Sequence, residues 1–306
     1  MTYIKSCLTA FLFIHVLMIL FPAVSVLADE KPRLGRESMM DTYHRNASRL
    51  AANSFGLPLY LDSFEFEEQV HVDVYGIFDY PFDSIITLLK VPANWCDIVA
   101  LHPNVKACTY KERSGDWLLT FYIGRKFYQP PEEADLIVYR YQNVIQQQGY
   151  QDIVLTADAG PFGTEDHRMR FEALSLEGGK TFVHVSYGYR DTVTLRLAEK
   201  FYFATLGRSK VGFTVTGTDR NDKPVHIGGP RGAIERNAVR YYFAIRTFMD
   251  TFRYPEESRF RMRISQWYDL TSFYRKQLFD LEKQEYLASK TTEHKNQVLL
   301  QRSVGN

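Results

Sequence analysis

The sequence predicts an α+β fold in which a curved antiparallel sheet wraps around one long helix near the C-terminus. Two observations predict this fold. From Gly228 to Phe252, apolar side chains recur at three- and four-residue spacings, which places them on one side of a helix of about six turns. Before this helix, most segments alternate apolar and polar residues between turn signals, as strands with one buried face do. We also expect an extra N-terminal helix and a C-terminal helical tail.

The first 28 residues have the features of an export signal. Lys5 precedes an apolar run from Cys7 to Phe21, and the small residue Ala28 ends the segment. Pro22 and Ala28 favour cleavage after Ala28. An uncleaved anchor is the alternative, because the stretch is long enough to span a bilayer at about 20 residues. We therefore expect an exported protein, periplasmic in a bacterium and secreted otherwise.

The composition indicates a globular chain with no electrostatic attraction to nucleic acid. The 306 residues are 45% apolar, which is ample for a sizeable core. The chain has 37 Lys and Arg and 36 Asp and Glu, and one of those lysines lies in the export signal. The rest is formally neutral, so nucleic acid is not an expected partner.

We expect four regions along the chain: the signal at 1–28, a lead-in with a helix at 29–63, the main domain at 64–254 and the tail at 255–306. In the main domain, Val70, Val72 and Val74 alternate with polar residues and predict a first strand. Two short helices follow within Phe82–Leu101. Further strands are expected at 105–112, 117–127, 136–145, 152–157, 168–176, 181–189 and 210–216. Residues 194–206 suit either an inserted helix or a strand.

The tail regains helical periodicity from Met262 to Lys295, with apolar residues between charges of both signs. It could cover the outer face of the sheet. The alternatives are a protein partner or a transient contact with a membrane surface.

Two cysteines, Cys96 and Cys108, remain after the signal is removed. In an exported chain two nearby thiols are more often bridged than free, so we expect a disulfide between them. A catalytic thiol assisted by His102 is the first alternative. A metal site is the second, although it lacks a fourth ligand.

The order of elements, from the first strand at Val70–Asp79 to the long helix at Ala233–Phe252, resembles that of the START-like superfamily. This superfamily has the helix-grip fold and includes StAR-related lipid-transfer domains, polyketide cyclases and plant hormone receptors. The resemblance covers about residues 64–252. It implies an apolar cavity between sheet and helix that holds a lipid or another hydrophobic molecule.

If the resemblance holds, the cavity is lined from both sides. The lining residues implied are Tyr241, Tyr242, Ile245, Phe248 and Met249 on the helix, and Phe171, Val183, Val185, Tyr187, Phe213 and Val215 on the strands. The alternative is that these large side chains fill the space completely.

A cluster of arginines near the start of the long helix could bind an anion such as a lipid headgroup. Arg231, Arg236 and Arg240 lie near the positive end of the helix dipole, behind Gly228-Gly229. The alternative is a capped helix start in which these arginines pair with acids such as Glu235.

The sequence contains no recognisable catalytic, metal or cofactor motif. No two histidines have the i,i+4 spacing of a helical metal site, and nucleophile-elbow, phosphate-loop and dinucleotide patterns are absent. We therefore expect no catalytic residue, metal or cofactor, and a carrier or sensor of a hydrophobic ligand. One alternative is a cyclase or hydrolase with His184 as base. The other is a partner-binding module that acts through the tail.

Overall fold

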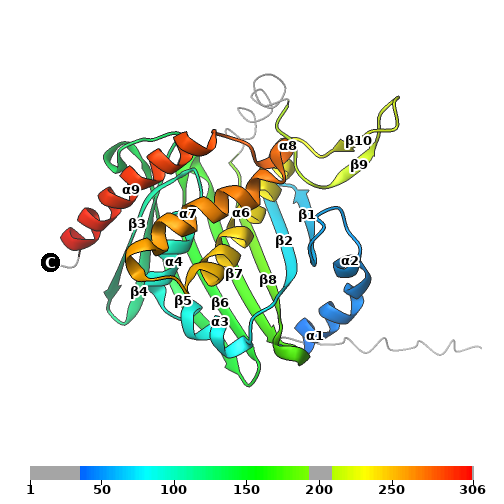
Figure 1. Cartoon of the computed structure of the whole chain (residues 1–306), viewed down its shortest axis with the longest axis horizontal. Coiled ribbons are helices and arrows are strands. Elements are labelled where there is room, and N and C mark those ends of the chain that lie inside the picture. The colour runs from blue at the N-terminus through cyan, green and yellow to red at the C-terminus, as the bar shows by residue number, and fades with distance from the viewer. Residues whose placement is uncertain (1–34, 193–208, 305–306) are drawn as a thin grey trace, which may run out of the picture. The chain divides into compact units, whose positions relative to one another are not determined.

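The computed structural model describes residues 35–192 and 209–304, which belong to one compact unit (Figure 1). The expected export signal and the segment at 194–206 lie outside the described residues. The regional boundaries expected at 63 and 254 fall within this unit. It has an α+β architecture.

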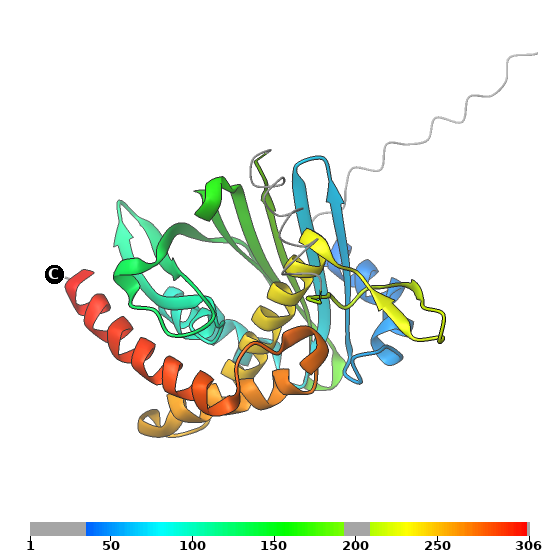
Figure 2. The ribbon, with the colours of Figure 1, turned by 90° about the horizontal axis from the view of Figure 1, so that it is seen from above.

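Eight antiparallel strands form one curved sheet in the order β1-β2-β8-β7-β6-β5-β4-β3. Figure 2 shows this sheet curving around helix α6, with α7 on the far side of α6 from the sheet. The strands are β1 (Leu59–Phe66), β2 (Gln69–Phe78), β3 (Val105–Arg113), β4 (Asp116–Ile123), β5 (Asp135–Gln147), β6 (Tyr150–Ala159), β7 (Glu165–Ser175) and β8 (Thr181–Arg190). The helix-grip arrangement is therefore confirmed.

The helices occupy both sides of the sheet. Helices α3 (Phe82–Leu89), α4 (Pro92–Val99) and α6 (Gly229–Thr251) lie on its inner side. The tail folds into α7 (Glu256–Ser272), α8 (Arg275–Leu278) and α9 (Lys283–Val304). The expected N-terminal helix is two helices, α1 (Arg36–Arg45) and α2 (Ala47–Ala51).

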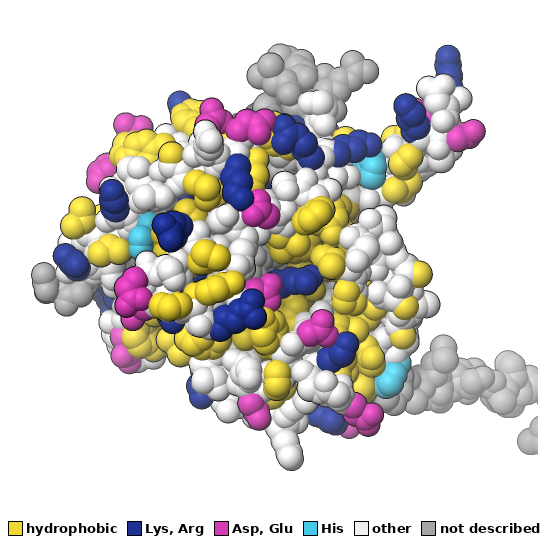
Figure 3. Space-filling view, in the orientation of Figure 1, with side chains coloured by type: hydrophobic (Ala, Val, Ile, Leu, Met, Phe, Trp, Pro, Cys, Tyr) yellow, Lys and Arg dark blue, Asp and Glu magenta, His cyan; other side chains and the backbone are white. Residues whose placement is uncertain are grey.

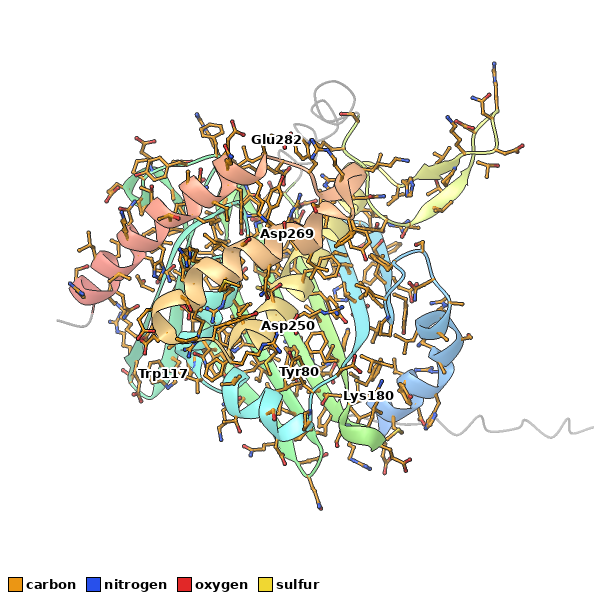
Figure 4. All side chains as sticks on the ribbon, viewed as in Figure 1. Tyr80, Trp117, Lys180, Asp250, Asp269 and Glu282 are labelled. Carbon is orange, nitrogen blue, oxygen red and sulfur yellow. A yellow bond between two sulfur atoms is a disulfide. The ribbon has the colours of Figure 1, made fainter. Side chains whose placement is uncertain are left out.

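Helix α6 approaches β2 closely at one glycine. A Cβ atom at Gly76 would lie 1.9 Å from the Tyr242 hydroxyl oxygen, so only glycine lets this ring lie across the strand. Towards the C-terminal end of α6, the Tyr80 hydroxyl donates to Asp250 over 2.6 Å, and Figure 4 labels both residues. These two contacts hold the middle and the C-terminal end of α6 against the end of β2 and the turn that follows it.

The prediction of a strand at 210–216 is wrong. Only Val215 and Thr216 of this segment belong to a strand, the short β9 (Val215–Thr218), which pairs with β10 (Pro224–His226) in a separate two-stranded sheet. The physical reason is the carboxylate of Glu235, which accepts hydrogen bonds from the backbone N–H groups of Phe213 (2.6 Å) and Thr214 (3.0 Å). Those groups are satisfied by α6 and need no neighbouring strand.

Helices α1 and α2, and not the tail, pack on part of the outer face of the sheet. Met39 and Leu50 on these helices form a small second core with Tyr60, Phe182 and Leu174 on the strands. Helix α9 instead lies along β3, the edge strand of the sheet. The expectation that the tail covers the outer face is therefore wrong, although it does pack on its own domain.

Glutamines on α9 replace the missing neighbour of the edge strand. The Gln297 side-chain oxygen accepts from the Cys108 N–H (2.8 Å), and Gln301 both accepts from the Tyr110 N–H (2.9 Å) and donates to the Tyr110 carbonyl (2.9 Å). A buried ion pair between Lys106 and Glu293 (2.7 Å) adds a charged contact beside them. An uncovered edge strand invites pairing with other chains, and α9 prevents this.

We expect Gln297→Leu to destabilise the protein, because it leaves the buried Cys108 amide without its acceptor. The free energy of unfolding should fall by about 1–3 kcal/mol. Urea denaturation measures the change, with Gln284→Leu on the exposed side of α9 as the matched control. An equal effect of the two substitutions would show that the edge contact has no special role.

The cysteines expected to pair lie at disulfide distance. Cys96 on α4 and Cys108 on β3 have Cα atoms 5.0 Å apart, a separation that a disulfide spans without strain in the backbone. Both residues are buried. A bond here ties α4 to the edge strand and so fixes one wall of the space beneath α6.

We expect the mature protein from an oxidising host to contain no free thiol when denatured without reductant. Cys96→Ala combined with Cys108→Ala should lower the free energy of unfolding by about 3 kcal/mol, because the unfolded chain gains conformational freedom. Alkylation followed by mass spectrometry counts the thiols. The reduced wild-type protein is the control, and two alkylated cysteines without reduction would contradict the pairing.

Candidate functional site

An apolar gap lies between the inner face of the sheet, α4 and α6. Its lining residues include Trp95, Ile98 and Val99 on α4, Leu155, Met169, Phe171 and Val185 on the strands, and Tyr241 and Ile245 on α6. Its volume is about 10 Å³, which is about enough for one water molecule. Among the described residues, then, this space is packed and not a ligand-sized cavity, as the alternative interpretation of the lining predicted.

The expected lining residues divide into three groups. Phe171, Val185, Tyr241 and Ile245 line the gap. Others belong to the same core without lining the gap: Val183, Tyr242, Phe248 and Met249 are buried in it, and Tyr187 is partly buried against it. Phe213 stacks on Phe55 away from the gap (ring centroids 5.0 Å apart), and Val215 is 50% exposed on β9, so the expectation that Val215 faces the cavity is wrong.

Sequence reasoning missed the contribution of α4 and of two strand residues. Trp95, Ile98 and Val99 were expected to be helical but not to line the gap. Met169 could have been found, because it alternates with Phe171 on a strand with one apolar face. Leu155 could not, since its place depends on pairing with Met169 across β6 and β7.

A polar cluster borders the gap on the inner face and consists of Tyr139, His167 and Tyr187, which we call the hydroxyl cluster. His167 Nδ1 lies 3.1 Å from the Tyr187 hydroxyl, and its Nε2 lies 2.8 Å from the Thr164 hydroxyl. Tyr187 pairs across the sheet with Met169 of the gap, which places the two features side by side.

Every member of the hydroxyl cluster is uncharged at neutral pH. Burial lowers the pKa of His167 to about 4, so its ring is neutral. Burial raises the pKa of Tyr139 and of Tyr187, so both phenols keep their protons. The cluster can exchange hydrogen bonds with a neutral polar group, but it offers no charged partner and no activated nucleophile.

The candidate base His184 lies on the other face of the sheet. Its Nε2 is 2.8 Å from an Asp73 carboxylate oxygen and its Nδ1 is 2.7 Å from a Glu172 carboxylate oxygen. Both ring nitrogens are therefore engaged, and neither points into the gap. His184 cannot serve as a base for a ligand held between the sheet and α6, which contradicts that version of the enzyme hypothesis.

The environment of His184 is that of a structural ion pair. Burial acts to lower the pKa of His184, but the hydrogen bonds to Asp73 and Glu172 outweigh it and raise this pKa above its ordinary value. Burial acts to raise the pKa of Glu172, whereas the bond from His184 brings it below its ordinary value. Arg170 also contacts Glu172 (3.1 Å) and Asp152 (2.8 Å), which extends the ionic network over the outer face.

We expect His184→Gln to remove a pH-dependent part of the stability. Because the folded-state pKa of His184 is raised, its contribution is complete below the unfolded pKa of about 6.5 and is lost as the pH rises through the folded pKa. The difference in unfolding free energy between wild type and variant should therefore shrink from pH 6 to pH 9. Urea denaturation at each pH measures this difference, with His44→Gln at an exposed position of α1 as the control. A difference independent of pH would contradict this assignment.

Two of the three arginines expected to bind an anion have acceptors within the protein. Arg231 donates to the Ser63 carbonyl (2.8 Å), and Arg240 pairs with Asp280 (2.6 Å) with only 1% of its side chain exposed. Arg236 is buried as well. The start of α6 is thus bonded to its own surroundings.

Within residues 35–192 and 209–304, no group of three or more His, Cys, Asp or Glu is arranged to hold a metal ion. None of the helices in this part of the chain combines the length and hydropathy that crossing a bilayer requires.

Comparisons with known proteins give only distant likenesses. No family model and no curated protein matches the chain. Similar solved structures include the START superfamily protein from Mycobacterium smegmatis (12% identity, 44% of this chain and 88% of that chain, TM-score 0.32) and norcoclaurine synthase from Thalictrum flavum (10% identity, 45% and 80%, TM-score 0.33). The Zhui aromatase/cyclase from Streptomyces sp. R1128 is another (12% identity, 41% and 70%, TM-score 0.30).

At these TM-scores we draw no functional argument from the likenesses. The helix-grip arrangement of this chain rests on its own topology, a curved antiparallel sheet around α6 with two short helices between β2 and β3.

Proposed function

We propose that this protein is an exported carrier or sensor that binds a hydrophobic molecule between the inner face of its sheet and α6. The observation that carries this proposal is the apolar gap with the uncharged hydroxyl cluster on its border. Ligand sites commonly combine an apolar wall with a few converging polar groups. Export through residues 1–28 and a disulfide between Cys96 and Cys108 are parts of the same proposal.

Ligand entry requires that side chains move, because the gap holds only about 10 Å³ in this structure. Met169 is the most adaptable wall residue, since its unbranched side chain has several low-energy rotamers. Displacing it would join the gap to the hydroxyl cluster, because Met169 pairs with Tyr187 across β7 and β8. We therefore expect a mostly apolar ligand with a neutral hydroxyl or carbonyl group that reaches His167 or Tyr187.

The two other hypotheses have less support. A cyclase or hydrolase acting in this space lacks its proposed base, because His184 is on the outer face. A partner-binding module acting through the tail is weakened by the packing of that tail, since Trp267 of α7 donates to the Arg240 carbonyl (3.2 Å) and α9 bonds to β3.

Native mass spectrometry of the protein purified from an exporting host tests the proposal. We expect a bound species that organic extraction releases and that has lipid-like solubility. A sample that carries no ligand, and that gains none after incubation with a lipid extract, would contradict the proposal.

Val185→Phe should reduce ligand retention, because the larger side chain fills the gap between Phe171 and Tyr241. Overpacking at this position should cost about 1–3 kcal/mol of stability and leave the protein folded. The matched control is Val138→Phe on the exposed outer face of β5. Equal retention by the two variants would place the ligand outside the gap.

A further inference from the structure

A second groove lies outside the grip, between the α7–α8 turn and the loop that precedes β1. Phe55 and Leu57 form one wall, and Leu270, Phe273 and Tyr274 form the other. Its volume is about 520 Å³, within the range of about 300–1,000 Å³ that small-molecule sites have. In Figure 3, hydrophobic side chains gather in a hollow beside α7 on this side of the molecule.

The floor of the groove is an ordered set of aromatic rings. Phe55 stacks on Phe213 with centroids 5.0 Å apart, and Tyr274 contacts both rings at 5.7 and 5.9 Å. The Tyr274 hydroxyl donates to the Phe55 carbonyl over 2.7 Å, which joins the two walls. The floor is therefore preformed, and a ligand would not have to open it.

The rim is apolar and cationic. Phe273 stands at the edge with 82% of its surface exposed. Arg275, Lys276 and His226 also line the groove, and no Asp or Glu of the described part of the chain is among its lining residues. Arg275 forms an ion pair with Glu282 (2.8 Å), whereas Lys276 forms no ion pair with another described residue. An anionic group above this floor would meet the ammonium group of Lys276, which also interacts electrostatically with the exposed Asp219.

We propose that this groove binds a single-chain amphiphilic anion, with its acyl chain on the rings of Phe55, Phe213 and Tyr274 and its carboxylate at Lys276. The apolar floor explains the acyl chain, and the cationic side chains that line the rim explain the sign of the head group. This site is separate from the gap beneath α6, and it does not depend on the function proposed for that gap.

Isothermal titration calorimetry of the mature protein with dodecanoate, below its micelle concentration, tests this site. We expect dodecanoate to bind about tenfold more tightly than dodecyltrimethylammonium, which has the same chain and the opposite charge. Lys276→Glu should weaken dodecanoate binding about tenfold, whereas Lys111→Glu, an equal charge change on exposed β3, should leave it unchanged. Phe273→Ser should weaken both amphiphiles several-fold through lost apolar contact.

Three results would overturn the proposal: equal binding of the two amphiphiles, dodecanoate binding that survives both Lys276→Glu and Phe273→Ser, or no binding at about 1 mM dodecanoate. Val185→Phe separates the two sites. If Val185→Phe abolishes dodecanoate binding while Lys276→Glu does not, the acyl chain of dodecanoate lies in the gap beneath α6. That result overturns this inference and supports the function proposed for the gap.

Discussion

The seating of α6 on the inner face of the sheet is the constraint on which the rest of the structure depends. Gly76 lets the Tyr242 ring cross β2 at a distance no other residue would allow. A helix held this close leaves little space beneath it, and Trp95 and Phe171 occupy most of what remains. The same contact therefore stabilises the domain and limits the size of any molecule that it could enclose.

The two faces of the sheet differ in charge because side chains alternate along each strand. On β8, Val183 and Val185 face α6, whereas His184 between them faces outward to Asp73 and Glu172. The inner face carries uncharged polar groups such as His167 and Tyr187. A charged group beneath α6 would lose its hydration without a compensating partner, whereas the outer network pairs its charges with one another.

The tail completes the fold. Strand β3 ends the sheet, and its outward-facing backbone groups bond to Gln297 and Gln301 of α9. On the other side, α7 packs against α6, and Lys283 at the start of α9 bonds to Asp269 of α7 over 2.6 Å (Figure 4). The turn between α7 and α8 places Phe273 and Tyr274 beside the loop that precedes β1. The second groove lies between that turn and that loop.

The sequence by itself determined the elements whose signals are local. The three- and four-residue spacing of apolar side chains defined α6, and period-two alternation defined β2 and β7. The inward direction of Phe171, Val183 and Val185 was implied by the resemblance of the element order. The number and spacing of cysteines predicted the pairing of Cys96 with Cys108, which the structure places at the required distance.

Only the tertiary structure decided features that depend on partners distant in sequence. The segment at 210–216 has the alternation of a strand, but the Glu235 carboxylate takes its backbone N–H groups, and no local pattern shows this. The same holds for the filling of the gap and for the place of α9. The volume of the gap and the covering of β3 by α9 each depend on two surfaces that meet only after folding. A sequence pattern describes only one of those surfaces.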